Sequence, residues 1–219
     1  MASRPALDLT LYLVTDPDLL PPERWPEAAA AAVRGGVTLV QLRNKRAGED
    51  EIVRQALALR RALDPLGVKL IVNDHPRAAK RAGAAGVHVG QGDMDPRRAR
   101  DVVGPDVVLG LSVTAEAQLD SVDPGVVDHL GVGPVFGTAT KPDHDPPLGL
   151  AGLARVAARA PLPCVAIGGI SRANAAAVAG TGAAGIAVVS ALLGQPGVEG
   201  AARALRAEIA RGRGEGRAA

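Results

Sequence analysis

The residues best suited to chemistry in this chain are cations and carboxylates placed at the ends of short apolar runs. Gln41, Arg43 and Lys45 are spaced two residues apart where one such run ends. In an extended chain this spacing puts the three side chains on one side. A guanidinium can hold phosphate oxygens in a fork, and an ammonium adds a point charge. The pattern predicts an anion site, with an ordinary solvated loop as the alternative.

Two carboxylates, Asp74 and Asp93, follow the next two apolar runs. If these runs are neighbouring strands, the two carboxylates lie close together and close to Arg43 and Lys45. Mg²⁺ takes oxygen ligands and usually bridges to substrate phosphates, so we expect Asp74 and Asp93 to bind Mg²⁺. The alternative is helix capping, because a proline follows each of them within three residues.

The second half of the chain carries hydroxyls and glycines after its apolar runs. Ser112 ends one run and is expected to contact a substrate. The segment 133–141 combines two threonines and a lysine with flexible backbone, which suits oxyanion binding, and its continuation is long enough for a lid. Gly168-Gly169 and Val189-Ser190 follow the last two runs, where backbone N–H groups commonly bind a phosphate. Together these segments predict a second anion site without an evident metal.

Eight apolar segments position these residues, and they alternate with stretches of helical period such as Glu51–Leu63, Leu153–Ala160 and Val198–Arg211. Nearly continuous runs of Val, Leu and Ile are typical of parallel strands covered by helices. Eight such units predict a (β/α)₈ TIM barrel, whose active site lies at the C-terminal ends of the strands. The expected strands are Leu9–Thr15, Thr38–Arg43, Lys69–Asn73, Gly86–Gly90, Val107–Ser112, His129–Val135, Cys164–Gly168 and Gly185–Val189.

Length and composition fit a single domain. The chain has 219 residues, of which 47% are hydrophobic and only 1% aromatic, so Ala, Val and Leu must build the core. We expect one domain over residues 1–219, with flexible tails at about 1–7 and 212–219. The 25 basic residues nearly balance the 23 acidic ones, and aromatic side chains for stacking on bases are scarce, which argues against nucleic-acid binding.

The remaining sequence features predict a cytoplasmic protein without membrane contact. The N-terminus has no apolar signal core, and the runs of small residues are too short to span a bilayer. Cys164 is the one cysteine and is more typical of a core residue than of a nucleophile. His88, inside an expected strand, is more typical of a buried, hydrogen-bonded residue. Whether the chain forms a homo-oligomer is left open.

The order and spacing of these segments resemble thiamine-phosphate synthases from about Leu11 to Leu193. The cations after the second strand and the Thr-x-Thr-Lys loop are the specific features, whereas Gly-Gly-Ile at 168–170 is common among barrels. The matching motifs are Gln41-Leu42-Arg43-Asn44-Lys45, Asn73-Asp74, His88-Val89-Gly90-Gln91-Gly92-Asp93, Gly133-Pro134, Thr138-Ala139-Thr140-Lys141 and Gly168-Gly169-Ile170.

The resemblance implies a transferase that joins a hydroxymethylpyrimidine diphosphate to a thiazole phosphate, or to its carboxylated tautomer, and releases pyrophosphate. The displacement at the pyrimidine methylene would be dissociative and would need no strong protein base, in agreement with the absence of an evident one here. Asp74 and Asp93 would hold Mg²⁺ on the diphosphate. Arg43, Lys45, Ser112 and Lys141 would be catalytic.

The resemblance also divides the binding residues into two sets. The pyrimidine diphosphate would be bound by Gln41, Leu42, Arg43, Asn44, Lys45, Asn73, Ser112 and Lys141. The thiazole phosphate would be bound by Thr138, Ala139, Thr140, Gly168, Gly169, Val189 and Ser190.

One departure from the family pattern follows Ser112. Many members have a small residue and then His or Arg there, but this chain has Val113 and Thr114, which puts secondary contacts near Ser112 in doubt. A thiazole tautomerase of the same fold and a noncatalytic barrel that binds thiazole or thiamine phosphates are the alternatives. Retention of Arg43, Lys45, Asp93, Lys141 and both threonines favours the synthase over the tautomerase, and the complete pair of anion sites argues against the noncatalytic barrel.

Overall fold

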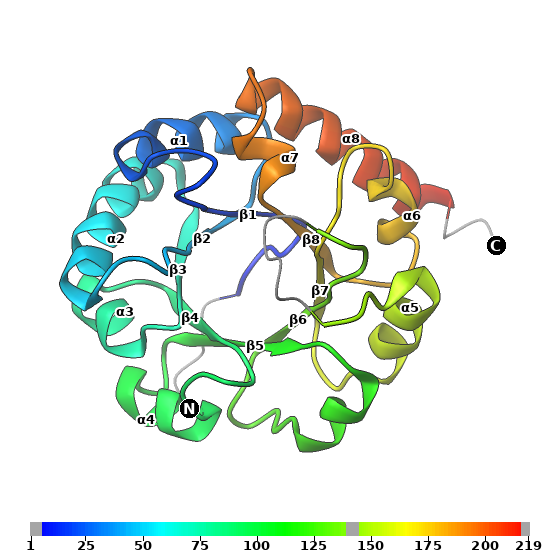
Figure 1. Ribbon diagram of the computed structural model, residues 1–219, viewed down its shortest axis with the longest axis horizontal. Helices are drawn as coiled ribbons and strands as arrows, with labels where there is room; N and C mark the ends of the chain where they lie inside the picture. The colour runs from blue at the N-terminus through cyan, green and yellow to red at the C-terminus, as the bar shows by residue number, and fades with distance from the viewer. Residues whose placement is uncertain (1–5, 139–144, 216–219) are drawn as a thin grey trace.

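The structure is a computed structural model that describes residues 6–138 and 145–215. Its strands run parallel to one another and close into a barrel in the order of the sequence, with helices around the outside (Figure 1). The predicted (β/α)₈ barrel is therefore confirmed. The strands are β1 (Leu11–Val14), β2 (Leu39–Leu42), β3 (Lys69–Asn73), β4 (Gly86–Val89), β5 (Val108–Val113), β6 (His129–Val132), β7 (Cys164–Ile167) and β8 (Gly185–Val188).

The helices cover the barrel on every side. None of them, within the described ranges, has the length and apolar composition needed to cross a lipid bilayer. The α-helices are α1 (Trp25–Arg34), α2 (Glu49–Leu63), α3 (Pro76–Ala82), α4 (Pro96–Val103), α5 (Gly149–Arg159), α6 (Ala175–Ala179), α7 (Ser190–Leu193) and α8 (Val198–Glu215). Short 3₁₀ helices are η1 (Pro22–Arg24), η2 (Asp64–Leu66) and η3 (Glu116–Ser121), and η3 stands alone between β5 and β6.

Every expected strand is present, but most are shorter than the apolar runs suggest. β6 ends at Val132 instead of Val135, since Pro134 has no N–H to donate to a sheet ladder. β2 ends at Leu42, so Arg43 lies just beyond the sheet, whereas β5 extends to Val113. The polar residues at the strand ends therefore belong mainly to the loops at the barrel mouth.

The flexible tail expected from residue 212 is wrong in its first part, because α8 continues to Glu215. Gly212 lies so close to α6 that a methyl group at its position would come within 2.0 Å of the Ala176 carbonyl oxygen. The absence of a side chain at 212 thus allows the last turns of α8 to pack on the domain.

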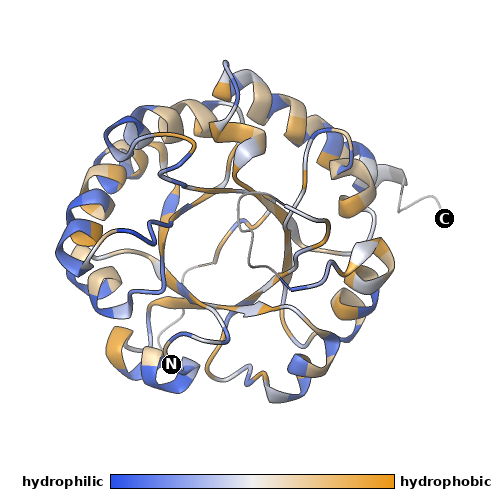
Figure 2. Cartoon of the chain, viewed as in Figure 1, coloured by the Kyte–Doolittle hydropathy of each residue, from blue (hydrophilic) through white to orange (hydrophobic). Residues whose placement is uncertain are grey.

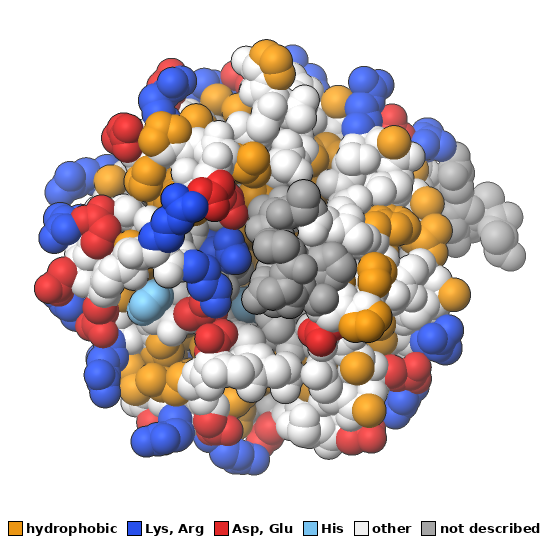
Figure 3. All heavy atoms as spheres, viewed as in Figure 1, with side chains coloured by type: hydrophobic (Ala, Val, Ile, Leu, Met, Phe, Trp, Pro, Cys, Tyr) orange, Lys and Arg blue, Asp and Glu red, His pale blue; other side chains and the backbone are white. Residues whose placement is uncertain are grey.

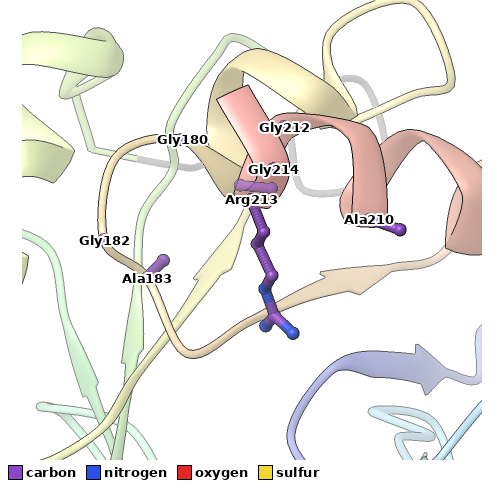
Figure 4. A pocket seen from close by; sticks show the side chains of 8 residues that line it. Gly180, Gly182, Ala183, Ala210, Gly212, Arg213 and Gly214 are labelled. Carbon is purple, nitrogen blue, oxygen red and sulfur yellow. The ribbon is translucent and has the colours of Figure 1, made fainter. Parts of the chain in front are cut away.

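Arg213 connects the end of α8 to the seam where the barrel closes. Its guanidinium donates to the carbonyl of Ala184, just before β8, and its Nη1 lies 3.5 Å from Thr10 Oγ1, just before β1. A cavity of about 520 Å³ beside it is lined by Gly and Ala residues and by Arg213 itself (Figure 4). The cavity lies between the end of α8 and the segment that joins α6 to β8.

Apolar side chains form two layers because successive residues of a strand point to opposite faces. Leu11 and Leu13 pack outward against the helices, while Tyr12 and Val14 point into the barrel. The strands and the inner sides of the helices are predominantly hydrophobic, and the rim is hydrophilic (Figure 2). The interior apolar cluster consists of Leu9, Tyr12, Val14, Leu39, Ile71, Val165 and Ala187.

Two histidines occupy the β4–β6 side of the barrel interior. His88 and His129 are 7% and 2% exposed, and their ring centroids lie 5.6 Å apart. Gly110 and Gly131 make room for the rings, since a methyl group at Gly110 would lie 2.2 Å from His88 Nδ1. Burial lowers the pKa of His88 to about 4 and that of His129 to about 3, so both rings are neutral near pH 7.

These neutral histidines make folding stability depend on pH. Below about pH 6.5 the histidines of the unfolded chain bind protons, whereas the two buried rings of the folded chain do not. The free energy of unfolding therefore decreases as the pH is lowered. The expected loss is up to about 1.4 kcal/mol per pH unit for each ring, down to the folded pKa values. Urea unfolding at several pH values between 7 and 5 measures it. His129→Phe, which lacks one of the two rings, is the control. We expect its free energy of unfolding to depend less steeply on pH than that of the wild type. Identical slopes would contradict the assignment of His129 as a neutral ring.

Candidate active site

The described residues that the sequence singles out lie at or just after the C-terminal ends of the strands, and so share one mouth of the barrel. Basic and acidic side chains gather beside the centre of this face, on the side of β1 to β4 (Figure 3). The predicted residues Ala139, Thr140 and Lys141 lie outside the described residues. Their proposed roles stay predictions.

Arg43 is held in place by the loop that follows β1. Its Nη1 donates to Asp16 Oδ2 at 3.1 Å, and the Asp16 side chain is only 5% exposed. Thr15 fixes the backbone of Arg43 from both sides, because its Oγ1 accepts from the Arg43 N–H and donates to the Arg43 carbonyl. The guanidinium is therefore oriented by a buried counter-charge before any substrate arrives.

Lys45, Asp74 and Asp93 form a compact charged cluster from three successive loops. Lys45 Nζ lies 2.5 Å from Asp74 Oδ2, and Asp93 Oδ2 accepts the Gly90 N–H at 2.8 Å. Asp74 has φ of 61°, a left-handed conformation that Asp tolerates better than most residues. Neither carboxylate caps a helix, since His75 and Asp95 occupy the N-cap positions of α3 and α4. The capping alternative is thus excluded.

The electrostatics of the two carboxyls favour a shared cation. Burial raises the pKa of Asp74 above its usual range; its hydrogen bond with Asp93 adds to this, and Lys45 opposes it. Burial would also raise the pKa of Asp93, but hydrogen bonds with Asp74 and the Gly90 N–H, aided by nearby positive charge, hold that pKa below its usual range. Two carboxyls this close need a proton or a cation between them.

The composition of this cluster fits Mg²⁺, although among the described residues no group of three or more His, Cys, Asp or Glu side chains is placed to hold a metal. Mg²⁺ is commonly bound by one or two carboxylates and completed by water and substrate phosphates. Two carboxylates at an open mouth meet that requirement.

Ser112 stands on β5 between the charged cluster and the buried histidines. His88 Nε2 lies 3.0 Å from Ser112 Oγ, and Gln91 Nε2 donates to the Ser112 carbonyl. A methyl group at Gly90 would lie 2.8 Å from Asp93 Oδ2 and 4.0 Å from Ser112 Oγ. Ser112 and Asp93 therefore border the same small space, and the substrate contact expected of Ser112 stays a prediction.

Gln41 and Asn73 extend the site downward into the barrel. Gln41 is 6% exposed and its Nε2 donates to Tyr12 Oη at 3.0 Å. Burial raises the pKa of Tyr12, which stays protonated and keeps its hydroxyl hydrogen. Asn73 ends β3 directly beside His88 in the sheet register. These groups form a neutral polar floor beneath the charged rim.

Leu42 and Asn44, predicted as substrate-binding residues, turn their side chains away from the mouth. Leu42 is fully buried in the core between barrel and helices. Asn44 Nδ2 donates to Gln55 Oε1 of α2, and its Oδ1 accepts the Arg46 N–H. Only the backbone of these two residues is left to meet a ligand, since the strand alternation that aims Arg43 inward aims its neighbours outward.

Glycines allow the loops after β6 and β7 to touch. Gly168 and Gly169 have φ of 98° and 64°, and a methyl group on Gly169 would lie 2.6 Å from the Gly137 carbonyl oxygen. Phe136 N–H donates to the Gly168 carbonyl. This contact brings Thr138, one residue beyond Gly137, to the side of the mouth formed by β6 and β7.

The loop after β6 is anchored at both ends. The N–H groups of Leu148 and Gly149 donate to the carbonyls of Pro134 and Val135 at 2.9 Å each.

Val189 is the N-cap of α7, and Ser190 is the first residue of that helix. The predicted phosphate-binding segments after β6, β7 and β8 are therefore adjacent around the barrel, opposite the charged cluster.

Sequence reasoning missed Asp16 and Tyr12. Asp16 follows β1 as Asp74 follows β3, so its position after a strand was a usable signal. Tyr12 gave no such signal, because a tyrosine inside an apolar run reads as core. Cys164 is buried, and burial raises the pKa of its thiol to about 11, in keeping with a core role.

Comparison with known proteins supports a single family. The family model described as thiamine monophosphate synthase matches residues 11–192. Thiamine-phosphate synthases of Azorhizobium caulinodans and Xanthobacter autotrophicus are 46% and 48% identical over 202 residues each, covering 92% of this chain and 95% and 96% of theirs. The solved structure of thiamine phosphate pyrophosphorylase from Pyrococcus furiosus is 32% identical, with a TM-score of 0.85, and covers 94% of this chain and 98% of its own.

The match spans the whole barrel and every strand end that carries the charged, hydroxyl and glycine residues described above. Family-level matches of this extent, together with the predicted constellation at the mouth, leave one assignment: the chain belongs to the thiamine monophosphate synthase family.

Proposed function

We propose that the barrel mouth joins a hydroxymethylpyrimidine diphosphate to a thiazole phosphate, giving thiamine phosphate and pyrophosphate. The observation that carries this proposal is the cluster of Arg43, Lys45, Asp74 and Asp93 at the ends of β2 to β4. Two cations and two carboxylates at one point suit a diphosphate with a divalent cation, because each supplies what the other lacks. A tautomerase acting on a monophosphate would have no need of them.

The chain's residues act on the departing diphosphate. In the proposed reaction the bond between the pyrimidine methylene carbon and the diphosphate oxygen breaks, and the electron pair leaves with pyrophosphate. The thiazole nitrogen then gives its lone pair to the methylene carbon. Arg43 and Lys45 lie where negative charge grows on the leaving group, and stabilising charge that develops in the transition state is what accelerates a reaction.

Asp74 and Asp93 are the proposed Mg²⁺ ligands. Their close approach, which needs a cation or a proton between them, supports this role. When bound, Mg²⁺ supplies neutralisation of diphosphate charge and aids the departure of pyrophosphate. Lys45, paired with Asp74 at 2.5 Å, would be free to contact the diphosphate if a divalent cation neutralised the two carboxylates.

The thiazole phosphate is proposed to bind across the mouth, at the loops after β6, β7 and β8. Thr138, Gly168-Gly169 and Ser190 lie on that side. The two glycines let the loop after β7 pack against the loop after β6, and backbone N–H groups of the last loops of such barrels commonly bind a phosphate. The carboxylated tautomer carries the same phosphate, and we include it in the proposal, with its carboxylate leaving as CO₂ once the new C–N bond has formed.

The direct test is pyrophosphate release from both purified substrates in the presence of Mg²⁺. We expect release to require both substrates, and thiamine phosphate to appear in equal amount. Conversion of the thiazole tautomer without pyrophosphate release would identify a tautomerase. Binding of either phosphate without turnover would identify a noncatalytic barrel.

The buried counter-ion of Arg43 gives a more specific prediction. Asp16→Asn keeps the shape of the side chain but removes the charge that orients the guanidinium, and we expect kcat to fall about tenfold, the effect of roughly one hydrogen bond to a charged group. Steady-state kinetics on the diphosphate substrate measures the change. Asp18→Asn is the matched control, because Asp18 pairs with Arg46 on the surface. Equal activities of the two variants would contradict an orienting role for Asp16.

A further inference from the structure

The two buried histidines carry polar groups that the proposed reaction does not use. His88 Nδ1 and both ring nitrogens of His129 are buried and have no hydrogen-bond partner among the described residues. A buried polar atom without a partner costs about 1 to 3 kcal/mol, and such atoms in native proteins are usually satisfied by protein or by ordered water. Two of them, His88 Nδ1 and His129 Nε2, belong to facing rings and therefore point to a ligand between the rings.

The space between the rings is bounded by a glycine. A methyl group at Gly110 would lie 2.2 Å from His88 Nδ1 and 2.6 Å from His129 Nε2. The two nitrogens are therefore near enough to each other for one water to be within hydrogen-bond distance of both. Both rings are neutral at the pKa values given above, so each has one donor and one acceptor nitrogen, and a group that both donates and accepts can bridge them. Water meets these conditions.

His129 also borders a cavity at the opposite end of the barrel. This cavity of about 240 Å³ lies at the N-terminal ends of the strands and is lined by Leu7, Leu9, Val108 and Asp128 among others. A cavity of that volume has room for several waters. The ring nitrogens of His129 are themselves buried, so His129 stands between this cavity and His88.

We propose that His129 acts through one buried water on His88 and thereby positions the hydroxyl of Ser112. His129 Nε2–H donates to the water, and the water donates to His88 Nδ1. His88 is then protonated at Nε2, which donates to Ser112 Oγ across 3.0 Å. The Ser112 hydrogen is left pointing away from His88, toward the mouth, where it can donate to an anion.

Through this series of hydrogen bonds, His129 influences the orientation of the Ser112 hydroxyl from a distance. A neutral imidazole has one donor and one acceptor nitrogen, and the partner of one nitrogen decides the tautomer at the other. Without the water, His88 Nε2 is equally able to accept the Ser112 hydrogen, and that hydrogen is lost to the substrate. His129 is thus a positioning residue, and the inference rests on the substrate contact proposed for Ser112.

The activity test is a double-mutant cycle with His129→Phe and Ser112→Ala. Phenylalanine keeps the ring but has no nitrogen, and we expect kcat to fall about tenfold in the wild-type background, equivalent to one hydrogen bond. In the Ser112→Ala background the same change should have almost no effect, because the positioned hydroxyl is absent. His129→Gln, which keeps a donor near the Nε2 position, should restore most of the activity. A purely structural role would lower kcat equally in both backgrounds.

The second readout does not involve activity. Nitrogen-15 spectra of histidine-labelled enzyme contain four histidines, and we expect His88 as the Nε2–H tautomer in the wild type and as a mixture in His129→Phe. A crystal structure of the wild type should hold a water within hydrogen-bond distance of His88 Nδ1 and His129 Nε2, which tests the proposal even if a variant fails to fold.

The outcomes distinguish the positioning role of His129 from the proposed function. An unchanged His88 tautomer in His129→Phe, or no water between the rings, would overturn the positioning role while the proposed function stands. Full activity of Ser112→Ala would show instead that the substrate contact assigned to Ser112 is wrong, and the positioning role would fall with it.

Discussion

Arg43→Ala is expected to lower kcat/KM for the pyrimidine diphosphate by about a thousandfold. That ratio corresponds to about 4 kcal/mol of lost transition-state stabilisation, the magnitude seen when a donor to developing negative charge is removed. The guanidinium is singled out because it is 21% exposed, lies at the mouth and is oriented by Asp16. Steady-state assay of pyrophosphate release measures the change.

Two further variants separate chemistry from folding in this experiment. Removing Arg43 also leaves the Asp16 carboxylate buried with one partner fewer, which costs up to about 3 kcal/mol of stability. The double variant Arg43→Ala, Asp16→Asn should recover that stability but not the activity. Arg46→Ala, which removes a neighbouring exposed arginine, should retain nearly full activity. If Arg43→Ala turned over substrate normally, the diphosphate would have to bind elsewhere.

Asp93→Asn is expected to raise the Mg²⁺ concentration required for half-maximal activity by about one to two orders of magnitude. An amide keeps an oxygen ligand but removes the charge that a hard divalent cation prefers. The same substitution removes the like-charge repulsion with Asp74, so the effect on stability is small or favourable. A titration of activity against Mg²⁺ at saturating substrates gives the answer.

Asp95→Asn is the matched control for this titration. Asp95 lies two residues away and caps α4 by accepting the N–H groups of Arg97 and Arg98, a task that asparagine performs equally well. Its Mg²⁺ dependence should equal that of the wild type. Identical titrations for Asp93→Asn and wild type would count against metal binding by the carboxylate pair and would favour a shared proton in its place.

Most of the barrel could be predicted because each strand is a continuous apolar run, and such runs are typical of strands covered on both faces. The ends of the strands were less predictable. β6 stops at Val132 because Pro134 lacks an N–H, yet the apolar run continues to Val135. The end of α8 was missed for a related reason: Gly212 and Gly214 suggest a flexible tail, and only the contact with α6 makes glycine favourable there.

The candidate site was predictable where strand alternation alone decides it. Gln41 and Arg43 share one side of β2, and Asp74 and Asp93 meet because β3 and β4 are neighbours. The partnerships that cross the barrel were not predictable. His88 and His129 are neighbours across Gly110 because of the register of three strands. That register depends on the stagger of the whole barrel and cannot be predicted from the local sequence of any one strand.

The contacts of Arg213 with Ala184 and Thr10 have a consequence for how the chain folds during synthesis. β1 leaves the ribosome first, but one of its two edges pairs with β8, which is made near the end. Until then the edges of β1 and of the most recently made strand are exposed, and exposed edges invite pairing with other chains. The last turn of α8 arrives later still. Closure of the barrel therefore cannot precede the synthesis of β8, and a nascent chain halted between β8 and Arg213 should lack the contacts that join α8 to the closing seam.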